Sequence, residues 1–409
     1  MYDAGCITTS LVYYTALVAV RCQVPGPATD RPPAALGLPA SSGDRTTAPG
    51  VRASVSDGAR RPARRAGKHE GTLILTVRQM HDRIIGHDDL AAYAAAKVNL
   101  PKSIVDDRRA QLDYLTRRLE HYVGEHPDYD LIKIRGSGSV TKGTALKGSS
   151  DADMAAYVRA TAVGGVAAPE SQLLSWLRDR LIEVYGDTKR PEDFQVSDHA
   201  VGIVFHGSGL KVDVAPVIYE GDPDDRGYLV TRSGTRVLTS IRLHVRFIRR
   251  RKSDFGPGYA QLIRLIKAWV REQKRLDGAF RCKSFLVELI VAHLADHGWG
   301  GQPLAFDDYP AALEQVFAYV VRTRLAERIA FDDYYPASEL PGATGQPIEV
   351  FDPVNPTNNV VGQYTTTDRD RLVAAAHEAL DAIAEAEYAD TKGRAVACWK
   401  RVFGPGFEV

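Results

Sequence analysis

The sequence predicts an α+β protein in which a mixed sheet with helices forms one lobe and helices alone form a second. Short runs of alternating apolar residues, typical of strands, cluster between about residues 131 and 218. From about residue 259 onwards, apolar residues instead recur at spacings of three and four, which is typical of amphipathic helices. A chain of 409 residues is long enough for two such lobes, each with its own core.

The overall composition excludes several classes of protein. Lys and Arg total 52 against 51 Asp and Glu, so a net charge of +1 predicts no whole-molecule attraction to nucleic acid or to a membrane surface. The cysteines lie far apart, without a C-x-x-C motif, which disfavours a disulfide framework and a structural zinc site. They are Cys6, Cys22, Cys282 and Cys398. A reducing, cytoplasmic location is therefore expected.

Residues 1–71 are rich in Pro, Gly and Arg, and we expect this segment to be disordered because it offers little apolar surface to bury. The apolar stretch Ile7–Val20 is short for a membrane span and has no basic leader, which disfavours a signal peptide. The arginines between Arg60 and Arg65 are interpreted as solvated charge, with a basic arm for a partner as the alternative. Whether residues 1–70 are present in the native protein stays open.

Residues 72–240 are expected to form the first lobe. A long helix opens at Asn99-Leu100-Pro101, and Leu112, Leu115 and Leu119 give it one apolar stripe. The alternating runs then predict strands at about 131–137, 151–158, 194–197, 200–206 and 210–218, with a helix over 169–185.

The segment from Gly136 to Val158 joins a Gly-Ser turn to a strand that carries two carboxylates. Gly138 and Ser139 follow an apolar strand, where glycine lets the backbone amides approach a phosphate closely. In Asp151-Ala152-Asp153, the period of two on a strand places both carboxylates on one face. Carboxylate oxygens in such a pair are the ligands that Mg²⁺ prefers.

Asp213 is the candidate for a third carboxylate, which a two-ion site needs. In Leu210–Pro216, apolar residues alternate with Lys211 and Asp213, so both polar side chains face one side of a strand. A neighbouring strand could present Asp213 beside the first two aspartates. Tyr219 follows shortly and is either a platform for a base or a core residue.

Residues 241–409 are expected to form the helical lobe, with helices at about 259–275, 283–297, 309–326 and 368–388. Thr367 and Asp370 are interpreted as the capping box of the last helix. Lys267 lies one position off an apolar stripe, and from this pattern alone we favour solvent over a phosphate contact. Lys283-Ser284 begins a helix and forms either an anion site or a plain cap.

Three further features of this lobe have open interpretations. Glu288 is expected to hold Lys283 or to face water, rather than to act in catalysis. The loop Asp352–Asn359 is rich in turn formers and is interpreted as a brace between the lobes. The basic stretch Arg242–Lys252 is expected to be a solvated helix face with Leu243, Phe247 and Ile248 inward; an activating nucleic-acid surface is the alternative.

With these motifs in place, the run GSVTKGTALKGSSDAD resembles the active-site segment of the 2′-5′ oligoadenylate synthetases and of the bacterial cyclic-oligonucleotide synthases (CD-NTases) of CBASS antiphage defence. Both belong to the polymerase-β-like nucleotidyltransferases, as does cyclic GMP-AMP synthase. The segments LIRLIKAWV, KSFLVELIVA and FDPVNPTNNV are similar to later motifs of these families, and CWKRVFGPGF resembles the bacterial branch.

The resemblance implies roles for individual residues. Asp151, Asp153 and Asp213 would be the catalytic, metal-binding carboxylates for two Mg²⁺ or Mn²⁺ ions. Gly138 and Ser139 would hold the β- and γ-phosphates of the nucleotide. Lys267, Lys283 and Ser284 would contact the triphosphate from the helical lobe.

The resemblance also implies a function, in which a ribose hydroxyl attacks an α-phosphate, pyrophosphate leaves and a cyclic di- or trinucleotide second messenger results. A linear 2′-5′ oligoadenylate synthetase or another RNA or tRNA nucleotidyltransferase is the alternative. The expected partners are ATP and other nucleoside triphosphates as substrates, and an effector protein that responds to the product. A nucleic-acid activator is not favoured, and no membrane partner is expected.

Overall fold

The computed structural model describes residues 83–126, 129–148, 151–159, 161, 170–186, 188–197, 199–230 and 236–409. All of them fall within one of the two compact units of the chain. The predicted disordered segment, residues 1–71, lies outside the described residues.

The described strands form one seven-stranded sheet in the order β1-β2-β5-β4-β3, with β6 paired to β5 and β7 paired to β6. The strands are β1 (Leu131–Ser137), β2 (Asp151–Arg159), β3 (Phe194–Val196), β4 (Val201–Phe205), β5 (Leu210–Tyr219), β6 (Gly227–Val230) and β7 (Arg236–Thr239). Strands β2 and β5 run parallel, and the other pairs are antiparallel. The five predicted strands are confirmed, whereas β6 and β7 were not predicted.

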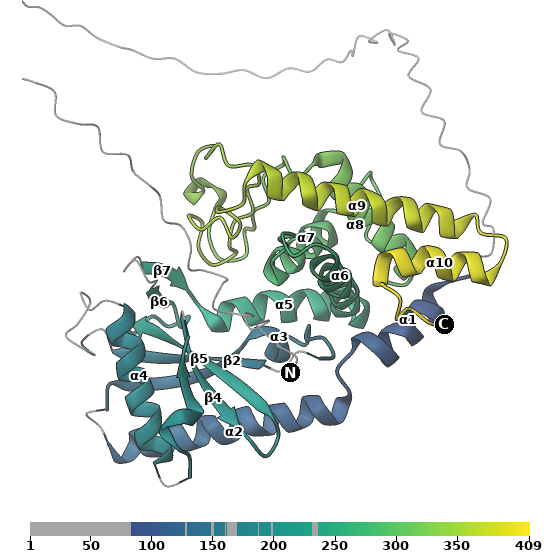
Figure 1. The fold of residues 1–409 in the computed structure, drawn as a ribbon. Coiled ribbons are helices and arrows are strands. Elements are labelled where there is room, and N and C mark those ends of the chain that lie inside the picture. The colour runs from purple at the N-terminus through teal and green to yellow at the C-terminus, as the bar shows by residue number, and fades with distance from the viewer. Residues whose placement is uncertain are drawn as a thin grey trace, which may run out of the picture. The chain divides into compact units, whose positions relative to one another are not determined.

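Helices cover the sheet and form the second lobe (Figure 1). The helices are α1 (His87–Tyr93), a π-helical turn (Ala94–Val98), α2 (Lys102–Glu125), α3 (Gly138–Lys142), α4 (Glu170–Tyr185), α5 (Ile241–Phe255), α6 (Pro257–Leu276), α7 (Ser284–His297), α8 (Tyr309–Thr323), α9 (Thr366–Glu387) and α10 (Lys392–Phe403), with short 3₁₀ turns at Pro191–Asp193 and Ala337–Glu339. The predicted α+β class, with a sheet lobe and a helical lobe, is confirmed.

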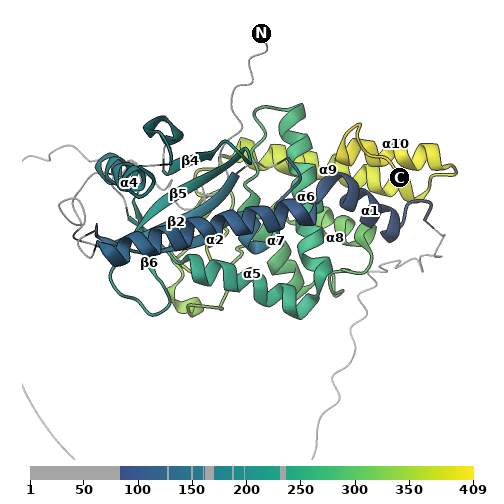
Figure 2. The same ribbon diagram turned by 90° about the horizontal axis from the view of Figure 1, so that it is seen from below.

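Two large apolar cores correspond to the two lobes. The sheet-side core takes Leu112, Leu115 and Leu119 from α2 together with residues from β1 to β5 and α4. The helical core takes residues from α5 to α10, and it also includes Leu90 and Tyr93 of α1. Figure 2 shows α2 running along the sheet and leading back to α1 beside the helical lobe. The chain therefore begins its described part in the helical core, although we expected residues 72–240 to belong to the first lobe.

One predicted helix start is wrong by two residues. Helix α9 is capped by Thr365, whose Oγ1 accepts from the amide of Asp368 at 3.1 Å. The Asp368 carboxylate accepts in return from the amide of Thr365 at 2.8 Å. Three threonines in a row, each followed three positions later by a polar residue, make the register of this capping box ambiguous in the sequence.

Candidate active site

Strands β2 and β5 bring two of the predicted carboxylates together. Their parallel register places Asp153 opposite Asp213 and Asp151 opposite Lys211. Neighbouring strands lie about 4.8 Å apart, and paired residues point to the same face. Asp153 is buried and the Asp213 side chain is 14% exposed, so the two carboxylates share one sheltered face. Asp151 lies two positions before Asp153 on β2, but its side chain lies outside the described part.

Lys211 and Gly202 surround Asp213. Lys211 Nζ lies 3.2 Å from Asp213 Oδ1, as the alternation in the sequence predicts. Gly202 on β4 pairs with Asp213, and a Cβ at this position would lie 2.4 Å from Lys211 Cε and 3.0 Å from Asp213 Oδ1. Gly202 was not predicted as a site residue; its signal in the sequence is a glycine inside an otherwise apolar strand.

Gly138 approaches Asp153 so closely that a side chain would not fit. Its φ is +70°, and a Cβ there would lie 2.0 Å from Asp153 Oδ2. The short helix α3 therefore begins directly against this carboxylate, with Ser139 in its first turn and Ser137 before it. The Ser137 Oγ is buried and has no hydrogen-bond partner within the described ranges. The predicted Gly-Ser turn thus lies against one of the predicted carboxylates, Asp153.

These residues line a hollow in the surface. Its walls come from Ser137 and Gly138, from β2 and β5 with Asp153 and Asp213, and from α5 with His244. Lys142, the last residue of α3, lines it as well. The hollow is therefore open to a ligand at the face that both carboxylates share.

Lys267 is buried, so the interpretation that it faces solvent is wrong. Its ammonium lies 2.7 Å from Glu288 Oε1 and 3.0 Å from the Thr144 hydroxyl. Lys142 approaches the other oxygen of Glu288 at 2.9 Å. The burial of Lys267 could not be predicted from the apolar stripe on α6, because its partners lie on α7 and in the segment after α3.

Glu288 is the centre of this buried cluster, and the expectation that it holds Lys283 or faces water is also wrong. Thr144 donates to it at 2.8 Å, in addition to the two lysines. Burial alone would raise the pKa of the Glu288 carboxyl, but Lys142 and Lys267 outweigh burial and lower this pKa to about 2. The cluster ties α3, which carries Gly138 at its start, to helices α6 and α7.

Lys283 and Ser284 lie at the start of α7, as predicted, but their cap positions differ from the plain-cap interpretation of Ser284. Lys283 is the N-cap residue, and Ser284 is the first residue of the helix, so Ser284 is not the cap. The Lys283 ammonium donates to the carbonyl of Val360 at 2.9 Å, and its backbone amide donates to the Tyr364 hydroxyl. Burial lowers the pKa of Lys283 to about 8, with Arg281 adding to the effect.

The loop Asp352–Asn359 braces the two lobes, as predicted. Asn355 donates to the carbonyl of Leu238 on β7 at 3.2 Å, and Asp352 contacts His244 of α5 at 2.7 Å. Within the loop, Asn358 donates to the Asp352 carboxylate.

Tyr219 lies at the far end of β5 from the carboxylates. It lies six positions after Asp213 along the strand, which corresponds to about 20 Å. Its ring meets Tyr157 edge-on, and Lys133 Nζ lies 3.8 Å from its centre. These contacts favour the core alternative over a platform for a base.

Helix α5 carries the basic stretch, and Leu243, Phe247 and Ile248 point inward as predicted. Arg251 departs from the expected solvated face because it is buried against Asp296 and Asp333. Four other arginines of α5 line a second hollow together with Arg135 of β1; they are Arg242, Arg246, Arg249 and Arg250. Among the residues that the structure describes, no acidic side chain lines this hollow.

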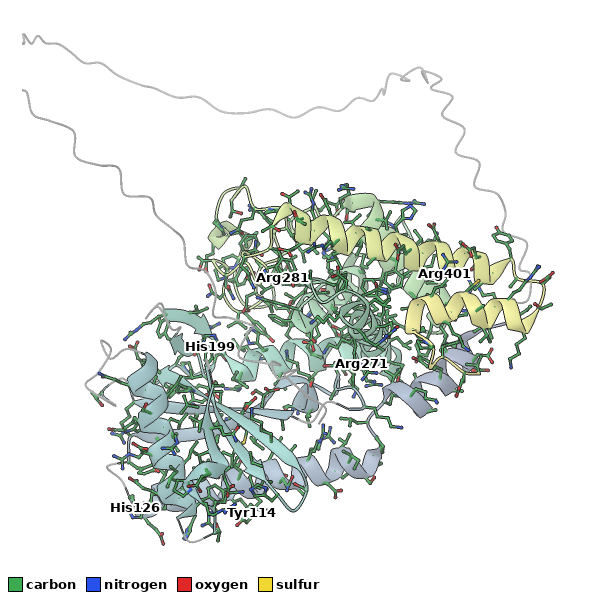
Figure 3. All side chains as sticks on the ribbon, viewed as in Figure 1. Tyr114, His126, His199, Arg271, Arg281 and Arg401 are labelled. Carbon is green, nitrogen blue, oxygen red and sulfur yellow. The ribbon has the colours of Figure 1, made fainter. Side chains whose placement is uncertain are left out.

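Figure 3 shows Arg271 on the helical side, where its guanidinium donates to the carbonyl of Lys147 at 2.7 Å. This contact again joins the segment after α3 to helix α6. The helical lobe thus contacts the end of α3 and the segment that follows it, while β2 carries Asp153.

The donor set at Asp153 and Asp213 fits a hard divalent cation, because carboxylate oxygens are the preferred ligands of Mg²⁺ and Mn²⁺. Among the described side chains, which exclude that of Asp151, no group of three His, Cys, Asp or Glu is arranged to hold a metal ion. Asp151 is the third carboxylate that the sequence predicts for this site. Across the described helices, none has the length and apolar character required to span a membrane.

Comparison with known proteins identifies close relatives. The chain is 42% identical to a cyclic AMP-AMP-AMP synthase of Escherichia coli (strain MS 115-1) over 327 residues, which cover 79% of this chain and 98% of the relative. Two solved structures of E. coli MS115-1 CdnC match as well. The complex with HORMA-deltaN gives a TM-score of 0.74 at 42% identity, covering 80% of this chain and 99% of that chain. The structure with ATP gives 0.75 at 41% identity, with the same coverage. No family model matches the sequence.

Proposed function

The chain belongs to the CBASS oligonucleotide cyclases, bacterial nucleotidyltransferases that join nucleoside triphosphates into cyclic oligonucleotides, and we propose that its product is a cyclic trimer of AMP. The observation that carries this proposal is the 42% identity to a cyclic AMP-AMP-AMP synthase along 98% of its length. The position of Asp153 and Asp213 on one face of the sheet also supports the proposal, because paired carboxylates suit a metal-dependent nucleotidyl transfer. ATP is accordingly the proposed substrate, as the relative has been solved with ATP.

Asp151, Asp153 and Asp213 are the proposed catalytic residues and the proposed ligands of two Mg²⁺ or Mn²⁺ ions. When bound, such ions would neutralise the triphosphate and lower the pKa of the attacking hydroxyl. Asp213 is the proposed acceptor of the proton from this hydroxyl, and Lys211 Nζ lies 3.2 Å from its Oδ1. The ribose oxygen then attacks the α-phosphorus, and pyrophosphate leaves.

Gly138 and Ser139 are proposed to hold the phosphates through the backbone amides at the start of α3. Lys283 and Ser284 would approach the triphosphate from the helical lobe. A phosphate contact by Lys267 would require its ammonium to leave Glu288 and Thr144. We therefore propose that Lys267 acts by holding Glu288, and through Glu288 the end of α3.

A regulator and an effector complete the proposed system. The E. coli relative has been solved in complex with HORMA-deltaN, and we propose that a HORMA protein binds this chain too, a partner that the sequence analysis did not anticipate. The effector that responds to the product stays a prediction.

The test is product analysis. The purified protein is incubated with labelled ATP and Mg²⁺ or Mn²⁺, with and without a HORMA partner, and the products are treated with phosphatase. A phosphatase-resistant species with the mass of cyclic tri-AMP is expected, because a closed ring has no terminal phosphate. A ladder of phosphatase-sensitive linear species would contradict the proposal.

The arginine-lined hollow on α5 is the place to test the alternative partner, nucleic acid. If product forms only when a duplex is added, and the duplex no longer activates the Arg246→Glu variant, the basic stretch acts as a sensor. Unchanged activity with and without duplex leaves it as a solvated face.

A further inference from the structure

His244 faces the candidate active site from the first turns of α5. The helix is capped by Ser240, whose hydroxyl accepts from the amide of Leu243 at 3.2 Å. The next residue, His244, lines the hollow that contains Asp153 and Asp213, and its side chain is 11% exposed. A polar ring is thus presented to whatever ligand occupies this hollow.

Asp352 holds one edge of this ring. His244 Nε2 lies 2.7 Å from Asp352 Oδ1, and Asp352 is fully buried. The same carboxylate accepts from the amide of Val354 at 2.8 Å and from the side-chain amide of Asn358 at 3.3 Å. Surrounded by these donors, Asp352 acts as an acceptor, so His244 must donate to it through Nε2.

The hydrogen on Nε2 decides what the other ring nitrogen can do. In the neutral imidazole, a protonated Nε2 leaves Nδ1 as a hydrogen-bond acceptor. Nδ1 has no hydrogen-bond partner among the residues that the structure describes. Phe285 meets the ring edge-on at a centroid distance of 5.4 Å and restricts its rotation. The ring therefore offers a fixed acceptor to a ligand that has a donor.

We propose that His244 is a specificity-determining residue, whose Nδ1 accepts a hydrogen bond from the exocyclic amino group of a nucleotide base bound beside Asp153 and Asp213. For adenine this group is the 6-amino group. Asp352 is then a positioning residue, because it sets the tautomer of His244. This inference rests on the proposed use of ATP.

The experiment compares ATP with purine riboside triphosphate, which lacks only the 6-amino group. Without this donor, Nδ1 stays unpaired beneath the bound base, so we expect kcat/KM for the analogue to fall at least about tenfold below that for ATP. His244→Ala should lower kcat/KM for ATP and leave that for the analogue nearly unchanged, so that the preference disappears. A merely structural role would lower both values equally and keep their ratio.

His206→Ala is the matched control. His206 Nε2 also lies 2.7 Å from an aspartate, Asp193, but His206 does not line the hollow, so the preference should persist in this variant. If the wild-type protein uses both nucleotides equally well, or if His244→Ala keeps the preference, the inference is overturned. The wild-type comparison stands even if His244→Ala fails to fold. Failure to use ATP at all would instead overturn the proposed function.

Discussion

Replacing Glu288 by Gln should destabilise the protein strongly, because it removes the negative charge from a buried cluster. Gln has nearly the same shape, but it removes the carboxylate that Lys142 and Lys267, each with a 5% exposed side chain, share. Breaking a buried ion pair by removing one partner costs about 3–5 kcal/mol.

The lowered pKa of Glu288 points in the same direction. A shift from the ordinary 4.5 to about 2 corresponds to about 3 kcal/mol in favour of the charged form in the folded state. Because the folded pKa is lowered, this contribution is complete above about pH 4.5 and is lost as the pH falls towards 2.

The assay is thermal and urea unfolding of the full chain at pH 7, where Glu288→Gln should lower Tm by an amount on the order of 5–10 °C. The matched control is Glu183→Gln on α4, because Glu183 pairs with Arg180 at 2.8 Å but is 44% exposed. We expect that control to change stability by less than about 1 kcal/mol. If both variants unfold alike, the cluster does not stabilise the junction of α3, α6 and α7.

Three other perturbations probe the site directly. Product formation should fall at least about a thousandfold, at unchanged Tm, in each of the variants Asp151→Asn, Asp153→Asn and Asp213→Asn. The control Asp179→Asn changes an exposed aspartate and should leave product formation unchanged. Near-native turnover by Asp153→Asn would refute the two-ion assignment. Gly138→Ala should lose activity because its Cβ would lie 2.0 Å from Asp153 Oδ2, while Gly207→Ala, with open space around it, should not; equal activity of the two would show that this close approach is dispensable. Since Lys283 has a pKa of about 8, an activity that needs its positive charge should fall as the pH rises through about 8, and Lys283→Met should remove this step from the pH profile; a flat wild-type profile to pH 9.5 would exclude the role.

Local periodicity accounts for most of what the sequence determined. The alternation in Leu210–Pro216 placed Lys211 and Asp213 on one side of a strand, and the structure has them 3.2 Å apart. The period of two likewise predicted Asp151 and Asp153 on one strand, which is β2. Periodicity succeeds here because the direction of a side chain on a strand depends on its own backbone and not on distant neighbours.

The tertiary structure alone decided which residues meet across the chain. The pairing of Asp153 with Asp213 depends on how the segment between β2 and β5 brings these strands side by side. No local sequence pattern specifies this register. Lys267 and Arg251 look like surface residues in sequence, yet each is buried against carboxylates from other elements. His244 likewise depends on its hydrogen bond to Asp352. Helices α6, α7 and α8 separate these two residues in the sequence. A buried charge is stable only beside its partner, and that partner's position is a property of the fold.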